Sequence, residues 1–169
     1  SFATYAEWLW GEGVGLGSAQ DTFDFLAAAI PADDGFWSLP IGDPGPDGLF
    51  DIAVYYRGAM TIHALRLEIG DEAFFRLLRR WVRSQAGTTV STAEFIDLAE
   101  RVAGRQLDDF FTTWLHTSAK PAGIEPPALA PDDVLVAASA TAPAVDGTPD
   151  WLAGAPVVVR AQHARLGEH

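Results

Sequence analysis

Cysteine is absent from this 169-residue chain, which excludes a disulfide framework, a thiolate metal site and a cysteine nucleophile. Lysine occurs once, as Lys120, and 11 basic residues are outnumbered by 23 acidic ones. The formal net charge of -12 disfavours nucleic acids and anionic membrane surfaces as partners, because binding to either requires a basic patch. No apolar run reaches the length of a membrane span, and the sequence leaves localisation open.

Several enzyme signatures are missing as well. The glycine series from Gly13 to Gly17 follows a predicted helix rather than a strand, so it is not a dinucleotide-binding loop. The chain contains no P-loop, no nucleophile elbow and no H-E-x-x-H zinc motif. Its four histidines are His63, His116, His163 and His169, and no two of them lie four residues apart. These absences remove the commonest nucleotide, serine-hydrolase and zinc-peptidase sites from the chain itself.

Large apolar side chains are abundant, and they predict a folded, mainly α-helical chain. Hydrophobic residues make up 49% of the sequence, with 6 Trp and 10 Phe, which is enough for one domain with a core. Hydrophobic periodicity and capping residues place the helices. The predicted helices are Phe2–Glu12, a segment from Ser18 or Asp21 to the stop at Pro31, Leu49–Ile69, Asp71–Gln85, Ser91–Val102 and Leu107–His116. Pro31–Gly48, rich in Pro and Gly, is predicted to be a loop.

The composition changes after Lys120 and Pro121. Four prolines between residues 121 and 131 predict a linker, and two short apolar runs follow, at 134–138 and 156–160. The sequence therefore predicts two parts: a helical part over residues 1–121, and a Pro-rich linker and tail over residues 122–169. The tail is expected to be irregular or to form a short β-hairpin, and its role is left open.

Two segments carry a resemblance to a known family. They are the opening Ser1-Phe2-Ala3-Thr4-Tyr5-Ala6-Glu7-Trp8 and the run Tyr55-Tyr56-Arg57-Gly58-Ala59-Met60. Both resemble zinc aminopeptidases of the membrane alanyl aminopeptidase and leukotriene hydrolase type, which are gluzincins. In that family an Asn-Glu-(Gly/Ser)-Phe-Ala pattern contains a zinc-ligand glutamate, and Tyr-x-(Lys/Arg)-Gly-Ala carries a catalytic tyrosine. The resemblance extends over about residues 1–121 and includes the run from Asp109 to Leu115.

The resemblance implies that this chain is the C-terminal, helical part of a zinc aminopeptidase catalytic domain. Tyr55 matches the catalytic tyrosine, Arg57 stands where Lys also occurs, and Gly58 would allow a close helix approach. The implied activity of the parent is removal of N-terminal residues from peptides, with zinc as cofactor. The chain lacks the H-E-x-x-H motif and the Gly-x-Met-Glu-Asn segment, and the third zinc ligand would lie just before Ser1. We therefore expect the isolated chain to hold no zinc and to be inactive.

Other polar residues have weaker functional interpretations. His63 lies on the Tyr55 helix and either faces a pocket or is packed, while His116 is expected at a helix end. Glu7 or Glu12 is a candidate for orienting a zinc ligand in the parent, and solvation is the simpler interpretation for both. Hydrophobic residues near Phe2, Tyr5 and the Tyr55 helix are expected to help line the substrate pocket. Four arginines at positions 76, 79, 80 and 83 share the polar side of a helix, which is either solvated or a docking surface. The opposite side of that helix is expected to carry an apolar stripe of Phe74, Phe75, Leu78, Trp81 and Val82.

The sequence is also compatible with two other functions. One is a non-catalytic helical docking or scaffold module derived from the peptidase fold. The other is an enzyme with a different metal site built on His63 or His116. In the aminopeptidase interpretation, the partners are a peptide substrate and the missing N-terminal half of the catalytic domain. Without that half, apolar surface near Phe2 and Tyr55 is left uncovered, and we expect self-association.

Overall fold

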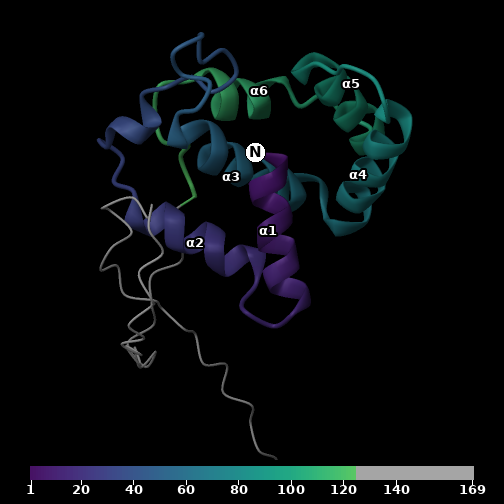
Figure 1. The fold of residues 1–169 in the computed structure, drawn as a ribbon, viewed down its shortest axis with the longest axis horizontal. Coiled ribbons are helices and arrows are strands. Elements are labelled where there is room, and N and C mark those ends of the chain that lie inside the picture. The colour runs from purple at the N-terminus through teal and green to yellow at the C-terminus, as the bar shows by residue number, and fades with distance from the viewer. Residues whose placement is uncertain (125–169) are drawn as a thin grey trace, which may run out of the picture. The chain divides into compact units, whose positions relative to one another are not determined.

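The structure is a computed structural model that describes residues 1–124, which fall within the first of two compact units, Ser1–Pro126. This part is helical, as predicted, and contains no strand (Figure 1). Its elements are α1 (Phe2–Gly13), α2 (Ala19–Ala29), the 3-10 turn η1 (Gly35–Trp37), α3 (Ile52–Ile69), α4 (Asp71–Gln85), α5 (Thr92–Ala103), α6 (Asp108–Phe111) and the π-helical turn η2 (Thr112–His116). The predicted β-hairpin tail lies outside the described residues.

Local capping signals set most of the helix ends. Ser18 and Ser91 each open a helix with a reciprocal capping box, paired with Asp21 in α2 and Glu94 in α5. The left-handed conformation of Gly104, with φ of 72°, ends α5. Because these signals act within four residues, the sequence predicts both helices, although it leaves the start of α2 open between Ser18 and Asp21.

The helices enclose one core (Figure 1). Helix α1 packs across α3 with α2 beside both, and α3 continues into α4, which packs on α5. Aromatic rings meet edge to face inside this array, for example Tyr5 with Phe74 at 5.8 Å between ring centroids. The largest fully buried side chains include Trp37, Arg57, Tyr5, Phe74 and Met60. The long helix α3 therefore contacts α1, α2, α4, η1 and η2.

Three details differ from the sequence expectation. Helix α3 begins at Ile52 rather than Leu49, because the Asp51 side chain accepts a hydrogen bond from the Ala53 amide and caps the helix there. The last helix ends in the π-helical turn η2 instead of continuing as an α-helix. Val82, expected on the apolar stripe of α4, is 68% exposed, while Leu77 is buried. Among residues 1–124, no helix is both long and apolar enough to cross a membrane.

Candidate functional site

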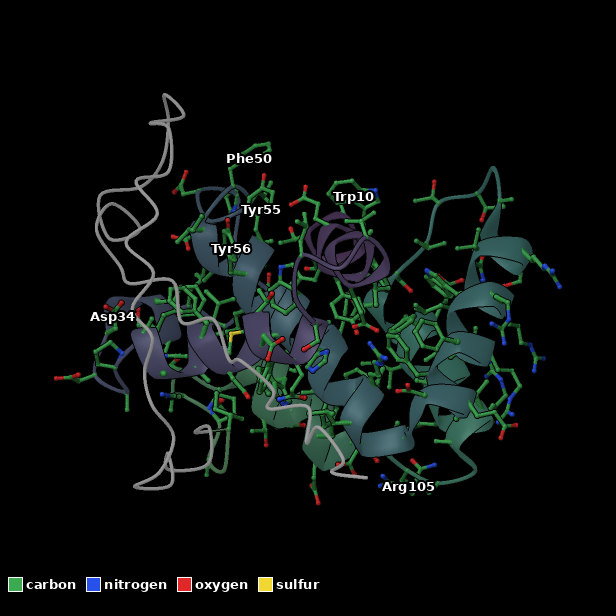
Figure 2. The ribbon with its side chains drawn as sticks, turned by 90° about the horizontal axis from the view of Figure 1, so that it is seen from below. Trp10, Asp34, Phe50, Tyr55, Tyr56 and Arg105 are labelled. Carbon is green, nitrogen blue, oxygen red and sulfur yellow. The ribbon has the colours of Figure 1, made fainter. Side chains whose placement is uncertain are left out.

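Tyr55 lies in the first turn of α3, where the chain emerges from the loop that precedes the helix. Its side chain is 39% exposed, and its hydroxyl group has no hydrogen-bond partner within residues 1–124. Figure 2 shows Tyr55 projecting from the same side of the molecule as Phe50 and Trp10. The phenol is therefore presented at the surface with its donor available to a group from outside the chain.

The start of α1 lies directly against this turn of α3. The Ser1 hydroxyl donates a hydrogen bond of 2.9 Å to the Val54 carbonyl, one residue before Tyr55. A Cβ atom on Gly58 would lie 2.0 Å from the Ser1 Oγ and 2.7 Å from its Cβ, so only glycine fits there without a shift. The two segments that carry the family resemblance thus meet at one place, although 53 residues separate Ser1 from Val54. The close helix approach expected at Gly58 is confirmed.

Arg57 does not reach the surface, since its side chain is fully buried. Its guanidinium donates hydrogen bonds to five backbone carbonyls: Trp114 at 3.0 Å, Trp37 at 2.9 Å, Leu39 at 3.2 Å, Thr113 at 3.3 Å and Thr117 at 2.8 Å. Burial lowers the pKa of Arg57 from its ordinary value, but an arginine stays charged at neutral pH. Sequence reasoning identified Arg57 only by its place in the motif and missed this set of contacts.

His63 is packed inside the protein rather than facing a pocket. Its Nδ1 lies 3.2 Å from the Tyr5 hydroxyl, and its Nε2 lies 3.0 Å from Oε1 of Gln20. Burial, followed by the nearby positive charge of Arg66, lowers the pKa of His63 to about 4. Both ring nitrogens are engaged in a neutral hydrogen-bonded chain, so His63 has no nitrogen left for a metal ion.

Tyr5 is buried in the same hydrogen-bonded set as His63 and Gln20. The expectation that Tyr5 lines a substrate pocket is therefore wrong for the described residues. It is 1% exposed, whereas Phe2 remains 43% exposed and packs edge to face on Phe95. Burial raises the pKa of Tyr5 above its ordinary value. Of the apolar residues proposed near the site, Phe2 reaches the surface and Tyr5 does not.

The remaining candidates lie away from Tyr55. Glu12 occupies the opposite end of α1 from Ser1, where it pairs with Arg66 and accepts a hydrogen bond from the Ala19 amide. These contacts lower the pKa of Glu12, with the Arg66 hydrogen bond as the largest cause. Glu7 is exposed on α1, and the exposed ring of His116 packs on Gly42. The arginines at 76, 79, 80 and 83 are exposed along α4.

A metal site requires several ligand side chains close together. Between positions 1 and 124, no three His, Asp or Glu side chains are grouped so that they could hold a metal ion. The donor set for zinc is therefore not present among these residues, and Tyr55 is the chemically distinctive group at the junction of α1 and α3.

Comparison with known proteins supports the resemblance to zinc aminopeptidases. No family model matches the chain. The chain is 34% identical over 95 residues to an aminopeptidase N from Lactococcus lactis subsp. lactis, and 29% identical over 75 residues to an aminopeptidase M1-C from Oryza sativa subsp. japonica. Among solved structures, it matches a mutant M1 zinc metallopeptidase from Deinococcus radiodurans bound to a Tyr-Ser-Ala substrate. That match has a TM-score of 0.61 and 33% sequence identity over 74% of this chain.

The homologues of this chain are M1 aminopeptidases. The solved relatives include a two-domain M1 zinc metallopeptidase mutant bound to L-tryptophan, with a TM-score of 0.61. The chain spans 11% of the Lactococcus aminopeptidase N, 8% of the Oryza protein and 28% of the Deinococcus chain. The helical fold matches a C-terminal helical region of an M1 peptidase, as the sequence predicted. The chain thus corresponds to part of its longer M1 aminopeptidase relatives.

Proposed function

We propose that this chain is the C-terminal helical part of the catalytic domain of a zinc aminopeptidase, and that Tyr55 stabilises the oxyanion formed during peptide hydrolysis. The observation that carries the proposal is the junction of α1 and α3. There the Ser1–Val54 hydrogen bond and the Gly58 contact hold the opening segment against the turn that presents Tyr55. A residue bonded to the amino group of Ser1 would lie beside the same turn. This is where the family pattern has its last zinc ligand.

The chemistry proposed for Tyr55 follows from the properties of a phenol. Its hydroxyl donates a hydrogen bond while remaining neutral at the pH of most enzymes. A donor aimed at the oxygen on which negative charge develops lowers the barrier of acyl transfer, because the charge is greater in the transition state than in the substrate. Its exposure, and the lack of a hydrogen-bond partner among residues 1–124, leave the Tyr55 hydroxyl available for that role.

The zinc ligands would have to come from residues outside 1–124. Zinc is named in the solved relatives, and when bound it would supply electrophilic catalysis and an activated water. The sequence contains no H-E-x-x-H, and residues 1–124 contain no group of ligands that fits zinc. We therefore propose that the isolated chain has no peptidase activity, and that activity requires a partner half that carries the zinc ligands.

The substrate class is inferred from the relatives. One solved relative is bound to the peptide Tyr-Ser-Ala, and another is bound to a single amino acid. We propose that the parent of this chain removes N-terminal residues from peptides. We also propose that the catalytic part ends near residue 121, with residues 122–169 forming a separate linker and tail.

The partner half would cover the side of the molecule on which Tyr55 lies. Phe50 is 84% exposed and Trp10 is 65% exposed, and both project from that side (Figure 2). Large apolar side chains that gather on one side typically mark a surface that another polypeptide covers. The isolated chain would therefore self-associate when that partner is missing.

The test is a pair of tyrosine variants in the longer protein that contains this chain. Tyr55→Phe removes the proposed donor, and kcat should fall by about a hundredfold or more with little change in KM. Tyr56→Phe makes the same chemical change one residue later and should retain near-normal kcat. Equal activity of Tyr55→Phe and the wild type would remove the proposed role, and an inactive parent would favour the docking module.

A further inference from the structure

Arg57 is a buried cation whose partners carry no charge. Within residues 1–124, the ion pairs involve Arg66, Arg76 and Arg105, and none involves Arg57. All but one of its hydrogen bonds go to backbone carbonyls, the exception being a 3.4 Å contact with the Thr117 hydroxyl. Taking a guanidinium out of water without a carboxylate is unfavourable unless its donors are satisfied. The five carbonyls meet that requirement.

The carbonyls belong to two segments on either side of α3 in the sequence. Trp37 ends the turn η1 and Leu39 follows it in the loop that leads to α3, while Thr113 and Trp114 lie in η2 and Thr117 directly follows it. The carbonyls of a last turn have no donors within their own helix. Arg57 supplies donors to three of them, and its guanidinium also lies 5.7 Å from the centre of the Trp37 ring. One side chain thus joins the loop, α3 and η2.

Arg57 and Tyr55 occupy opposite faces of the same helical turn. Two residues along an α-helix correspond to a rotation of about 200°. Arg57 is accordingly buried while Tyr55 is exposed, and the Tyr55 hydroxyl has no partner in the described part of the chain. The place of the phenol therefore depends on the backbone of this turn, which Arg57 holds from its buried side.

We propose that Arg57 is a positioning residue that fixes the first turn of α3 and thereby the place of Tyr55, without contacting substrate. The inference rests on the proposed role of Tyr55. Arginine suits this task better than lysine, because its planar group offers five N–H donors in fixed directions, while an ammonium offers three. Arg57→Lys keeps the charge and can donate to some of the five carbonyls. It should therefore retain part of the function that Arg57→Met removes.

Hydrogen exchange of the chain itself tests the structural step. The amides of residues 56–58 bond to carbonyls of the first turn, whereas those of residues 64–68 lie further along the same helix. Arg57→Met should accelerate exchange at 56–58 by about tenfold or more relative to 64–68, and Arg57→Lys should lie between Met and wild type. Equal acceleration at both sites, or none at either, would overturn the proposal. If Arg57→Met fails to fold, exchange is compared between Arg57→Lys and the wild type. Faster exchange at 56–58 than at 64–68 is again the expected result, and equal change at both sites would overturn the proposal.

A double-mutant cycle in the longer protein tests the link to Tyr55. Arg57→Met should lower kcat by about tenfold with KM nearly unchanged, and Arg57→Lys should recover part of that loss. In a Tyr55→Phe background, Arg57→Met should cause no further fall in kcat, because both changes act through the same phenol. A full further fall would overturn the positioning role while leaving that of Tyr55 intact. Normal kcat in Tyr55→Phe alone would instead remove the proposed function, and the inference with it.

Discussion

Gly58 faces Ser1 so closely that a Cβ atom on Gly58 would lie 2.0 Å from the Ser1 hydroxyl oxygen. This contact brings the N-terminal end of α1 onto the first turn of α3. It links the two sequence segments that resemble the zinc aminopeptidases and places Tyr55 beside their junction. The relationship is steric, and it can be tested without any assumption about catalysis.

Gly58→Ala should destabilise the chain by about 1 to 3 kcal/mol, since the added methyl group overlaps Ser1 in a packed contact. Gly11→Ala is a matched control, because Gly11 is also helical but a Cβ atom added there would meet nothing within 4 Å. That control should be neutral or stabilising by up to about 1 kcal/mol. Urea unfolding of both variants measures the difference. Equal effects of the two substitutions would show that the close contact has no energetic weight.

His63 should make stability depend on pH. Its pKa in the folded protein is about 4, below the ordinary value of 6.5, so between these values the unfolded chain binds the proton more tightly. The stability that neutral His63 contributes is complete above pH 6.5. It should fall by up to about 3 kcal/mol as the pH drops towards 4.

The measurement is the unfolding free energy of the wild type minus that of His63→Gln at several pH values. Carboxylates titrate in the same range, and the subtraction removes their common contribution. The difference should shrink between pH 6.5 and 4. A difference that stays constant across this window would mean that His63 is not held neutral by burial.

The isolated chain should retain no stoichiometric zinc. Both ring nitrogens of His63 are hydrogen-bonded, and the described residues contain no group of metal ligands. Metal analysis after exposure to zinc and desalting should give far less than one zinc per chain. One zinc per chain that disappears in His63→Ala or His116→Ala would support the rival metal enzyme.

Self-association should depend on the side of the molecule that presents Tyr55. Sedimentation of the wild type should show association that increases with concentration, and Trp10→Ser with Phe50→Ser should weaken it. Val82→Ser provides a control, because Val82 is also well exposed but lies on α4. A wild type that stays monomeric at high concentration would contradict an uncovered apolar surface.

Most helix positions were predictable because their signals are local. The capping boxes at Ser18 and Ser91 and the terminal Gly104 lie within a few residues of the ends that they define. The start of α3 was placed too early because Leu49 and Phe50 extended the apolar pattern. Both are exposed, and the Asp51 cap decides the boundary instead.

The interior of the site was harder to predict because its contacts join distant segments. Tyr55 was found from a short motif, and its catalytic role stays a prediction. The carbonyl partners of Arg57 come from positions up to 60 residues away, and the Gln20–His63–Tyr5 chain joins three helices. No spacing rule reveals such partners, since they depend on how α1, α2 and η2 pack around α3.

The sequence encoded immediately upstream of Ser1 tests most directly whether this chain is part of the catalytic domain of a zinc aminopeptidase. We expect an H-E-x-x-H motif followed by a helix that ends in Asn-Glu directly before Ser1, which would join the zinc ligands to the turn that presents Tyr55. A start codon or an unrelated domain at that position would contradict it, and the peptidase-like helices would then be a scaffold without the catalytic role proposed for Tyr55.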